Sequence, residues 1–441
     1  MSRPNPLVEV DGLKKHYPIT EGILKKQVGT VRAVDGISFD IDRGETVGLV
    51  GESGCGKSTA ATSLLRLEEP TDGAVWFDGE DVTEYDDQEL KAFRRRAQMI
   101  FQDPSSSFDP RMSIAESVAE PLRIHGMSDK SRRRAIVEDL LERVGLSARD
   151  ADRYPHEFSG GQKQRIAVAR ALSVNPEFIV ADEPVSALDV SIQAEILSLL
   201  EDIQDEFDLS FLLISHDMGV VRQVCDRVNV MYLGQIVESG PTEEVFDDPQ
   251  HPYTQALMSS IPQPDPRKRG MGVELTGSVP NPSNPPEGCR FHTRCPLVIP
   301  PEDIDLEQSV WRRVMDFRSR ADREGIEADV VVESHLDVED PGETGYDREQ
   351  VDAAIREEFE LPETLADADA ESAVSEAVDQ LTAGDGDAAA ATLREAFPTV
   401  CANEEPAMQD DGRRRVACHL QDERYAATMD DQLQVSGSAD D

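Results

Sequence analysis

The sequence contains no apolar stretch long enough to cross a membrane. A spanning helix needs about 20 consecutive apolar residues, and no such run occurs in the 441 residues. Residues 1–6 also lack the charged and then apolar pattern of a secretory leader. We therefore expect a cytoplasmic protein whose role at a membrane, if it has one, depends on a partner.

Cysteine is scarce, which excludes a disulfide framework. There are six cysteines, too few in a cytoplasmic protein of this length to hold the fold. Cys225 lies in a predicted helix and Cys55 in a glycine-rich loop, where a small buried residue suffices. The other four lie towards the C-terminus: Cys289, Cys295, Cys401 and Cys418. Four thiolates suit a [4Fe–4S] cluster or a structural zinc; the spacings match no generic zinc pattern, and four free thiols are the alternative.

Basic residues are outnumbered two to one. There are 88 acidic and 44 basic residues, which gives a formal net charge of −44 and opposes binding to nucleic acid. Only 9 of the basic residues are lysines. This composition favours a surface adapted to a salt-rich cytoplasm, with an ordinary acidic protein as the alternative. Residues 301–400 hold 29 acids and 8 bases, so 29 − 8 leaves −21 of the total charge in that segment.

A phosphate-binding loop dominates what is present. The pattern G-x-x-x-x-G-K-[ST] is matched by Gly51, Glu52, Ser53, Gly54, Cys55, Gly56, Lys57, Ser58 and Thr59. An apolar run at 46–50 predicts a buried strand before the loop, and a helix is expected from Lys57. The glycines allow successive N–H groups to point at an anion, and the helix dipole assists them. Lys57 is expected to reach the β- and γ-phosphates, and Ser58 to bind Mg²⁺.

Polar side chains follow three further apolar runs that we predict to be strands. Gln102 ends the first, where its carbonyl oxygen can meet Mg²⁺ or a water. Asp182 and Glu183 end the second: Asp182 is expected to hold the water shell of Mg²⁺, and Glu183 to polarise the attacking water. His216 follows the third and is placed to contact the γ-phosphate or orient that water. Strands that alternate with helices and carry ligands at their carboxyl ends predict an α/β parallel sheet.

Two other segments suit a nucleotide. A second anion cradle is predicted where a small-residue helix opens with Ser159, Gly160, Gly161 and Gln162. The two cradles would close on different faces of one nucleotide across a dimer; the alternative is a tightly packed helix start. Tyr17 ends the first predicted strand segment and suits stacking on adenine, with a half-buried strand tyrosine as the alternative.

Together these segments resemble the ATP-binding subunit of an ABC transporter. The phosphate loop, Gln102, residues 159–162, Asp182 with Glu183, the 186–189 segment ending in Asp189, and His216 appear in that family's order. The resemblance covers residues 7 to about 260. It implies a P-loop NTPase fold with an ABC-type ATPase core and two Mg²⁺-ATP molecules between head-to-tail subunits, with Tyr17 at the adenine and Asp189 among the nucleotide-binding positions. It also implies that the region around Gln102 docks onto a membrane permease.

The closer likeness is to the ATPases of dipeptide and oligopeptide importers. The matching stretches are 100–104, 109–111, the His-Pro-Tyr-Thr segment 251–254 and the proline- and cysteine-containing run 285–296. The chain resembles the second of two unlike ATPases, which implies a heterodimer, two permease subunits and an extracytoplasmic substrate-binding protein, with this chain peripheral on the cytoplasmic face of the membrane. Nickel and some oligosaccharide importers share this tail. Some members of the family hold an iron–sulfur cluster at the cysteines.

These observations predict the domain organisation. A nucleotide-binding domain is expected at 1–260, with a helical subdomain at about 103–174. A small cysteine-containing domain is expected from 261–298 plus 397–441, interrupted by an acidic insert at 299–396 whose periodic apolar positions indicate solvated helices broken near residue 384. Two other classes of function remain open: a soluble ABC ATPase without transport, and a nucleotide-binding regulator without catalysis.

Overall fold

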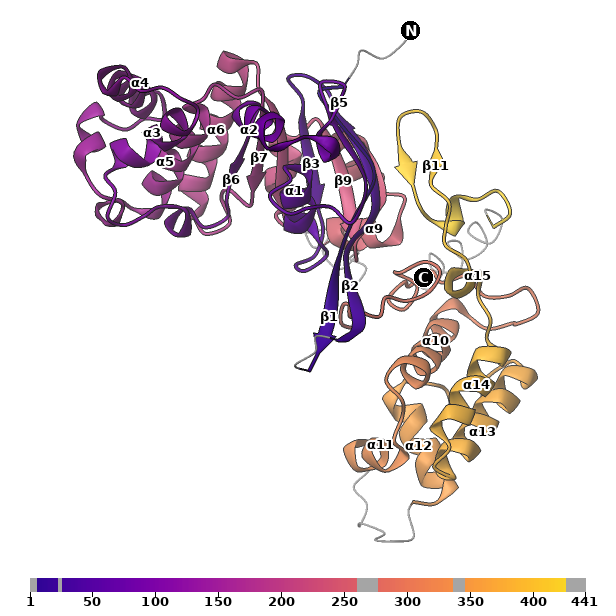
Figure 1. Ribbon diagram of the computed structural model, residues 1–441. Helices are drawn as coiled ribbons and strands as arrows, with labels where there is room; N and C mark the ends of the chain where they lie inside the picture. The colour runs from indigo at the N-terminus through magenta and orange to yellow at the C-terminus, as the bar shows by residue number, and fades with distance from the viewer. Residues whose placement is uncertain (1–5, 23–25, 260–276, 336–345, 426–441) are drawn as a thin grey trace. The chain divides into compact units, whose positions relative to one another are not determined.

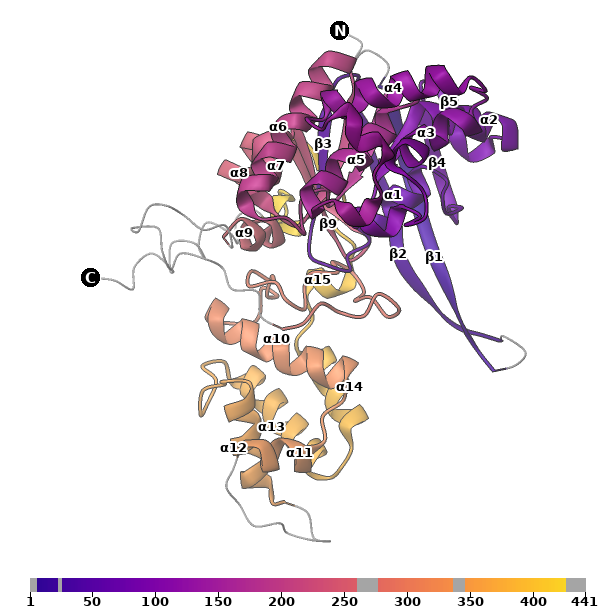
Figure 2. The same ribbon diagram turned by 90° about the vertical axis from the view of Figure 1, so that its left-hand side faces the viewer.

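The computed structural model describes residues 6–22, 26–259, 277–335 and 346–425, which are drawn from two sides in Figures 1 and 2. The chain forms two compact units. The first unit contains 1–270, 279–285 and 410–416, and the second contains 271–278, 286–409 and 417–441. Each unit has its own buried core.

An antiparallel sheet begins the first unit. Its strands are β1 (Val8–Glu21), β2 (Lys26–Ile41), β4 (Asp72–Phe77) and β5 (Glu80–Asp81), in the order β2-β1-β4-β5. The prediction that Tyr17 ends the first strand segment is wrong, because Tyr17 lies within β1 and pairs with Val31 of β2. Several register shifts interrupt the pairing of β1 with β2. Buried and exposed residues therefore alternate clearly only at the start of β1.

The second sheet of this unit is mainly parallel, as the sequence predicts. Its strands are β3 (Thr46–Val50), β6 (Ala97–Ile100), β7 (Phe178–Asp182), β8 (Ser210–Ser215), β9 (Arg227–Tyr232), β10 (Gln235–Pro241), β11 (Gln409–Asp410) and β12 (Arg415–Val416). The order is β11-β12-β10-β9-β3-β8-β7-β6. Neighbours from β9 to β6 are parallel, and β3, β7 and β8 are buried throughout, which explains their uninterrupted apolar runs.

The first unit also contains helices. They are α1 (Lys57–Leu64), η1 (Val82–Glu84), α2 (Asp87–Arg96), η2 (Pro104–Ser107), α3 (Ile114–Ile124), α4 (Lys130–Arg143), η3 (Ala148–Asp152), η4 (Pro155–Glu157), α5 (Gly160–Leu172), α6 (Val190–Phe207), α7 (Met218–Val224), α8 (Thr242–Asp247) and α9 (Pro252–Ser259). Figure 1 shows three of them, α3, α4 and α5, grouped together at one end of the unit. Within the predicted helical subdomain, α3 and α4 are separate helices, because Gly126 takes a φ of +91° and Asp129 caps α4.

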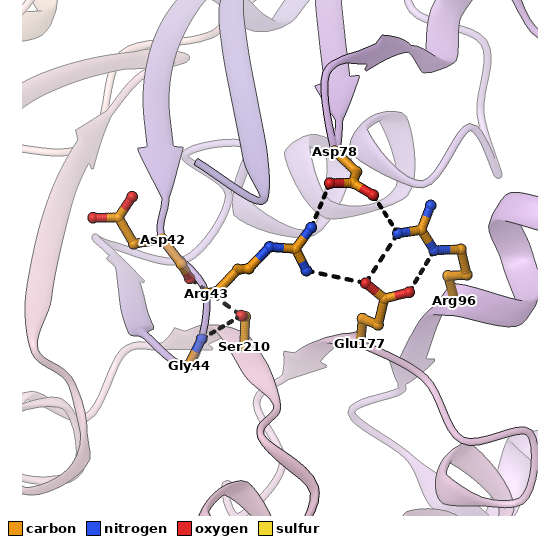
Figure 3. A network of polar contacts seen from close by, with 7 residues as sticks. All are labelled: Asp42, Arg43, Gly44, Asp78, Arg96, Glu177 and Ser210. Carbon is orange, nitrogen blue, oxygen red and sulfur yellow. Dashed lines mark hydrogen bonds and ion pairs between the residues drawn. The ribbon is translucent and has the colours of Figure 1, made fainter. Parts of the chain in front are cut away.

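A network of four charged residues joins elements of both sheets (Figure 3). Arg43, between β2 and β3, and Arg96, at the end of α2, each contact both Asp78 and Glu177. Asp78 follows β4 of the antiparallel sheet, and Glu177 precedes β7 of the parallel sheet. The network therefore lies at the amino ends of the parallel strands, and the carboxyl ends are left for other contacts.

The second unit is helical. Its elements are α10 (Gln308–Arg323), α11 (Ala328–His335), α12 (Arg348–Glu358), α13 (Ala368–Thr382), α14 (Gly386–Ala396), α15 (Val400–Asn403) and η7 (His419–Gln421). The expectation of solvated helices is wrong, because Trp311, Phe317, Val374 and Phe397 are fully buried. The predicted break is confirmed between α13 and α14. The acidic residues obscured this core, although those in the described helices are partly or fully exposed and the apolar faces of the same helices are buried.

Candidate nucleotide-binding site

The loop of residues 51–56 connects β3 to α1, as predicted. A Cβ atom on Gly51 would lie 2.1 Å from the carbonyl oxygen of Met231, and one on Gly56 would lie 2.0 Å from that of Ala33. No side chain fits at either position without moving a neighbouring backbone. The loop therefore lies pressed against β9 on one side and β2 on the other.

Lys57 lies at the base of this loop and is 5% exposed. Its Nζ donates hydrogen bonds to the carbonyl oxygens of Gly51, at 2.8 Å, and Glu52, at 3.0 Å. Both acceptors are neutral, so these two bonds do not cancel the charge of the ammonium group. A buried cation beside the start of α1 is suited to binding an anion.

Ser58 and Asp182 face each other across the loop and the end of β7. The Ser58 hydroxyl donates to Asp182 Oδ1 at 3.2 Å. Burial raises the pKa of the Asp182 carboxyl, and the hydrogen bond from Ser58 opposes this rise. A hydroxyl and a carboxylate at this separation supply the oxygen ligands that Mg²⁺ prefers.

Glu183 is held between two polar side chains. Its Oε2 accepts a hydrogen bond from Gln102 Nε2 at 2.7 Å, and its Oε1 lies 2.8 Å from His216 Nδ1. The three residues follow β6, β7 and β8, which are adjacent parallel strands, so their carboxyl ends meet at one edge. The carboxylate is thereby fixed in direction.

A cavity of about 520 Å³ opens at this edge. It is lined by Val31, Ala33, Ser53, Gly54, Gly56, Lys57, Ser58, Thr59, Gln102, Glu183, His216 and Pro282. Sequence reasoning missed Val31, Ala33 and Pro282. The carbonyl oxygen of Pro282 accepts a hydrogen bond from the N–H of Arg32 at 3.1 Å. No local pattern indicates this contact, which joins segments 250 residues apart.

Tyr17 does not line the cavity. Its hydroxyl donates to the carboxylate of Glu68, and Lys15 Nζ lies 5.0 Å from its ring centroid. Burial and the Glu68 contact raise the pKa of the Tyr17 hydroxyl, while a hydrogen bond to Thr59 lowers it. Tyr17 therefore lies beside the first turn of α1.

The second predicted cradle also lies apart from the cavity. Ser159 caps α5, where its hydroxyl accepts from the N–H of Gln162 and the Gln162 side chain accepts from the N–H of Ser159. Gly160 and Gly161 follow in the first turn. Asp189 caps α6 and accepts from the N–H of Ile192 at 3.1 Å. Ser159, Gly160 and Asp189 are exposed, so this surface is open to another molecule.

The four C-terminal cysteines lie together in the second unit. The N–H of Cys289 donates to the carbonyl oxygen of Cys401 at 2.8 Å. Burial raises the pKa values of the Cys289 and Cys295 thiols, and the nearby thiols of Cys401 and Cys418 raise them further. In the described part of the chain, no three or more His, Cys, Asp or Glu side chains are arranged to hold a metal ion.

Three family descriptions match this chain. "ABC transporter" matches residues 34–186, "Oligopeptide/dipeptide transporter, C-terminal region" matches 237–300, and "Domain of unknown function (DUF8228)" matches 308–414. Most of the helical second unit thus corresponds to a domain that has a family of its own.

The segment that matches this chain covers most of the length of each curated relative. The oligopeptide transport ATP-binding protein AppF of Bacillus subtilis is 52% identical over 299 residues, which are 67% of this chain and 90% of that protein. A putative peptide import ATP-binding protein of Brucella ovis is 52% identical over 294 residues, with 67% and 90% covered. The putative oligopeptide transport ATP-binding protein YkfD of B. subtilis is 51% identical over 298 residues, with 67% and 89% covered.

None of the helices in the described residues is both long enough and apolar enough to cross a membrane.

Proposed function

This chain belongs to the family of ABC transporter ATP-binding proteins that serve oligopeptide import, and we propose that it hydrolyses ATP to drive peptide uptake through separate permease subunits. One observation carries the proposal. Glu183, held between Gln102 and His216, lines the same cavity as Lys57 of the phosphate-binding loop. A fixed carboxylate that lines the same cavity as an anion cradle is suited to phosphoryl transfer to water.

The residues have separate roles in this proposal. Lys57 and the loop N–H groups hold the phosphates, while Ser58, Gln102 and Asp182 hold the magnesium ion or its water shell. Magnesium, when bound, neutralises charge on the phosphate oxygens. Glu183 accepts a proton from water at its carboxylate, and its short contact with His216 keeps that carboxylate in place.

Ser159 to Gln162 and Asp189 would act on the nucleotide of another subunit. Ser159, Gly160 and Asp189 are exposed and do not line the nucleotide cavity of this chain. Their exposure fits a nucleotide site that is completed by a partner subunit. A heterodimer with a second, unlike ATPase follows from the resemblance of this chain to one of two ATPases. Copurification of the two chains in the presence of Mg²⁺-ATP tests this pairing, and a stable dimer of this chain alone would contradict it.

A groove of about 320 Å³ supports docking on a permease. Its lining includes Leu67, Phe101 and Pro121, and Leu67 and Phe101 are 45% and 44% exposed. Large exposed apolar side chains around a hollow are typical of a protein interface. This contact would place the chain on the cytoplasmic face of the membrane, with peptide delivered by an extracytoplasmic binding protein. Charged substitution of Phe101 should release the chain from permease-containing membranes.

The substitution Glu183→Gln tests the proposed function. We expect steady-state ATP hydrolysis to fall by about 10²-fold or more, because general-base catalysis typically contributes that much. Nucleotide binding should persist, since the lysine and the loop are unchanged. The matched control is Glu142→Gln, on the exposed face of α4. Full activity in the Glu183 variant would refute the role of this carboxylate.

We further propose that the four C-terminal cysteines hold a [4Fe–4S] cluster. Burial and the neighbouring thiols raise the pKa values of Cys289 and Cys295, and a bound metal would favour their thiolates. Bound clusters supply electron storage or structural cross-linking, and no step of ATP hydrolysis depends on one.

A further inference from the structure

Tyr253 contacts the phosphate-binding loop directly. It is the second residue of α9, and its side chain is fully buried. The Tyr253 hydroxyl oxygen accepts a hydrogen bond from the backbone N–H of Glu52 at 2.8 Å. The two residues are separated by about 200 positions, and Tyr253 lies in the region matched by the oligopeptide transporter C-terminal family.

The Gly51–Glu52 peptide is the point at which the chain leaves β3 and enters the loop. The carbonyl oxygen of Gly51 accepts from Lys57 Nζ at 2.8 Å, and the N–H of Glu52 donates to Tyr253. Tyr253 therefore contacts the same peptide as the lysine that faces the cavity. A shift of this peptide would move both the lysine and the N–H groups that follow it.

Tyr253 is itself held by a rigid turn. Its backbone N–H donates to His251 Nδ1 at 3.0 Å, and its ring lies 4.7 Å from that of Tyr232. The N–H groups of Gln250 and His251 each donate to the buried carboxylate of Glu238 at 2.9 Å. Pro252 starts α9 with its backbone angle already fixed.

His251 keeps one protonation state in this turn. Burial lowers the pKa of its imidazole to about 3, so the ring is neutral at physiological pH and Nδ1 remains an acceptor. The support for Tyr253 is thus insensitive to pH near neutrality.

We propose that Tyr253 is a positioning residue of the ATPase site, whose hydroxyl fixes the first peptide of the phosphate-binding loop. The loop is then held in its binding conformation before the nucleotide arrives, and less ordering is required on binding. This inference rests on the proposed function for its nucleotide. It gives the His-Pro-Tyr segment a role in the affinity for nucleotide.

The substitution Tyr253→Phe removes the hydroxyl and keeps the ring against Tyr232. We expect the Kd values of the full-length chain for Mg²⁺-ATP and Mg²⁺-ADP to rise together by about three- to tenfold, the range of one net hydrogen bond. The kcat should change little, because Glu183 is untouched. Tyr85→Phe is the matched control: it removes a hydroxyl bonded to Glu80 at 2.9 Å, and Kd should change less than about twofold.

Amide hydrogen exchange of the nucleotide-free protein provides a second measurement. Exchange in residues 51–57 should be faster in Tyr253→Phe than in wild type. Exchange in the strands of the parallel sheet should be unchanged. Unchanged exchange together with unchanged Kd would overturn the proposal, as would a uniform increase in exchange, which indicates general destabilisation. A wild-type chain that binds no nucleotide would contradict the proposed function alone, because the exchange experiment uses no ligand.

Discussion

Glu183 occupies a backbone conformation that side chains rarely adopt. Its φ is +46°, which costs on the order of 1–3 kcal/mol for a residue with a side chain. Surrounding contacts maintain it: its N–H donates to the carbonyl oxygen of Ile214 at 2.9 Å, and its own carbonyl oxygen accepts from Ser186. Backbone strain of this kind occurs at functional sites, where it directs a side chain. Here it aims the carboxylate at the cavity.

The cysteine proposal is tested by single substitutions. We expect anaerobically purified wild type to contain stoichiometric iron and sulfide, and Cys401→Ser to lose both, because each of the four thiolates would hold one iron of the proposed cluster. Cys225→Ser, at a buried cysteine of the first unit, is the control and should keep them. Wild-type protein without iron and sulfide, or with equimolar zinc, would contradict the cluster.

Individual site residues could be predicted where local pattern and strand order agree. Lys57 and Ser58 follow from a motif, and Glu183 and His216 follow from their positions after buried runs, because neighbouring parallel strands end at one edge. Pro282 gave no such signal, since its place depends on tertiary contacts of an irregular segment. The segment that contains Tyr253 is part of the family resemblance. Its contact with Glu52 could not be predicted, because the two residues are far apart in the sequence.

The charge network of Figure 3 joins the ends of β4, α2 and β7, whose Phe77, Phe93 and Phe178 belong to one buried core. Glu177 accepts from Arg96 Nη2 at 2.9 Å and lies 3.1 Å from Arg43 Nη1. The Arg96 hydrogen bond, followed by Arg43, lowers the pKa of Glu177 below its ordinary value of 4.5. The carboxylate therefore stabilises the fold in its charged form.

Removal of this carboxylate should reduce stability in a pH-dependent way. We expect Glu177→Gln to lower the free energy of unfolding by about 0.5–1 kcal/mol at pH 7, a small amount because the side chain is partly exposed. The folded-state pKa is lowered, so the contribution is complete above pH 4.5 and disappears as the pH falls through the folded value. Urea unfolding at pH 7 and at pH 3.5 measures this, with Glu142→Gln as control.

A difference between wild type and Glu177→Gln that stays constant between these pH values would contradict the electrostatic explanation. It would indicate that Glu177→Gln destabilises the fold through lost packing of the side chain and not through its lost charge. High salt provides a second check, because screening should shrink the difference at pH 7.

Strands and helices could be predicted from the sequence where one or both faces are buried, because the apolar residues then follow a regular pattern. The strands β3, β7 and β8 are continuous apolar runs, which only a central sheet position explains. The break between α3 and α4 could have been read from Gly126 and Asp129, which end one helix and begin another. The length of β1 could not, since its outer half is held by pairing with β2 and has no buried face of its own.

At the scale of the whole molecule, a strongly acidic segment can still have a buried core. Residues 301–400 contain −21 of the net charge of −44, and yet the described parts of this segment, 301–335 and 346–400, form helices with a buried core. Acidic composition alone therefore did not indicate whether the insert folds. Its amphipathic spacing at Val374, Ala377, Val378 and Leu381, all buried in α13, was the better signal.

The insert should be removable without loss of the nucleotide site. Every residue that lines the cavity belongs to the first unit, whereas the insert belongs to the second. Thr399 Oγ1 donates to the carbonyl oxygen of Ile299 at 2.6 Å, so the two ends of the insert lie together and a short linker can join them. We expect the chain lacking 301–396 to bind Mg²⁺-ATP with wild-type affinity and to hydrolyse it.

The same deletion should disturb the cysteines. Trp311 and Arg312 of α10 donate to carbonyl oxygens of Val298 and of the loop between Cys289 and Cys295, and these contacts would be lost. Iron content should therefore fall while nucleotide affinity holds, and both are measured on one preparation. Loss of ATP hydrolysis with the first unit still folded would show that the bundle acts on catalysis, and full retention of iron would show that α10 does not support the cysteine loop.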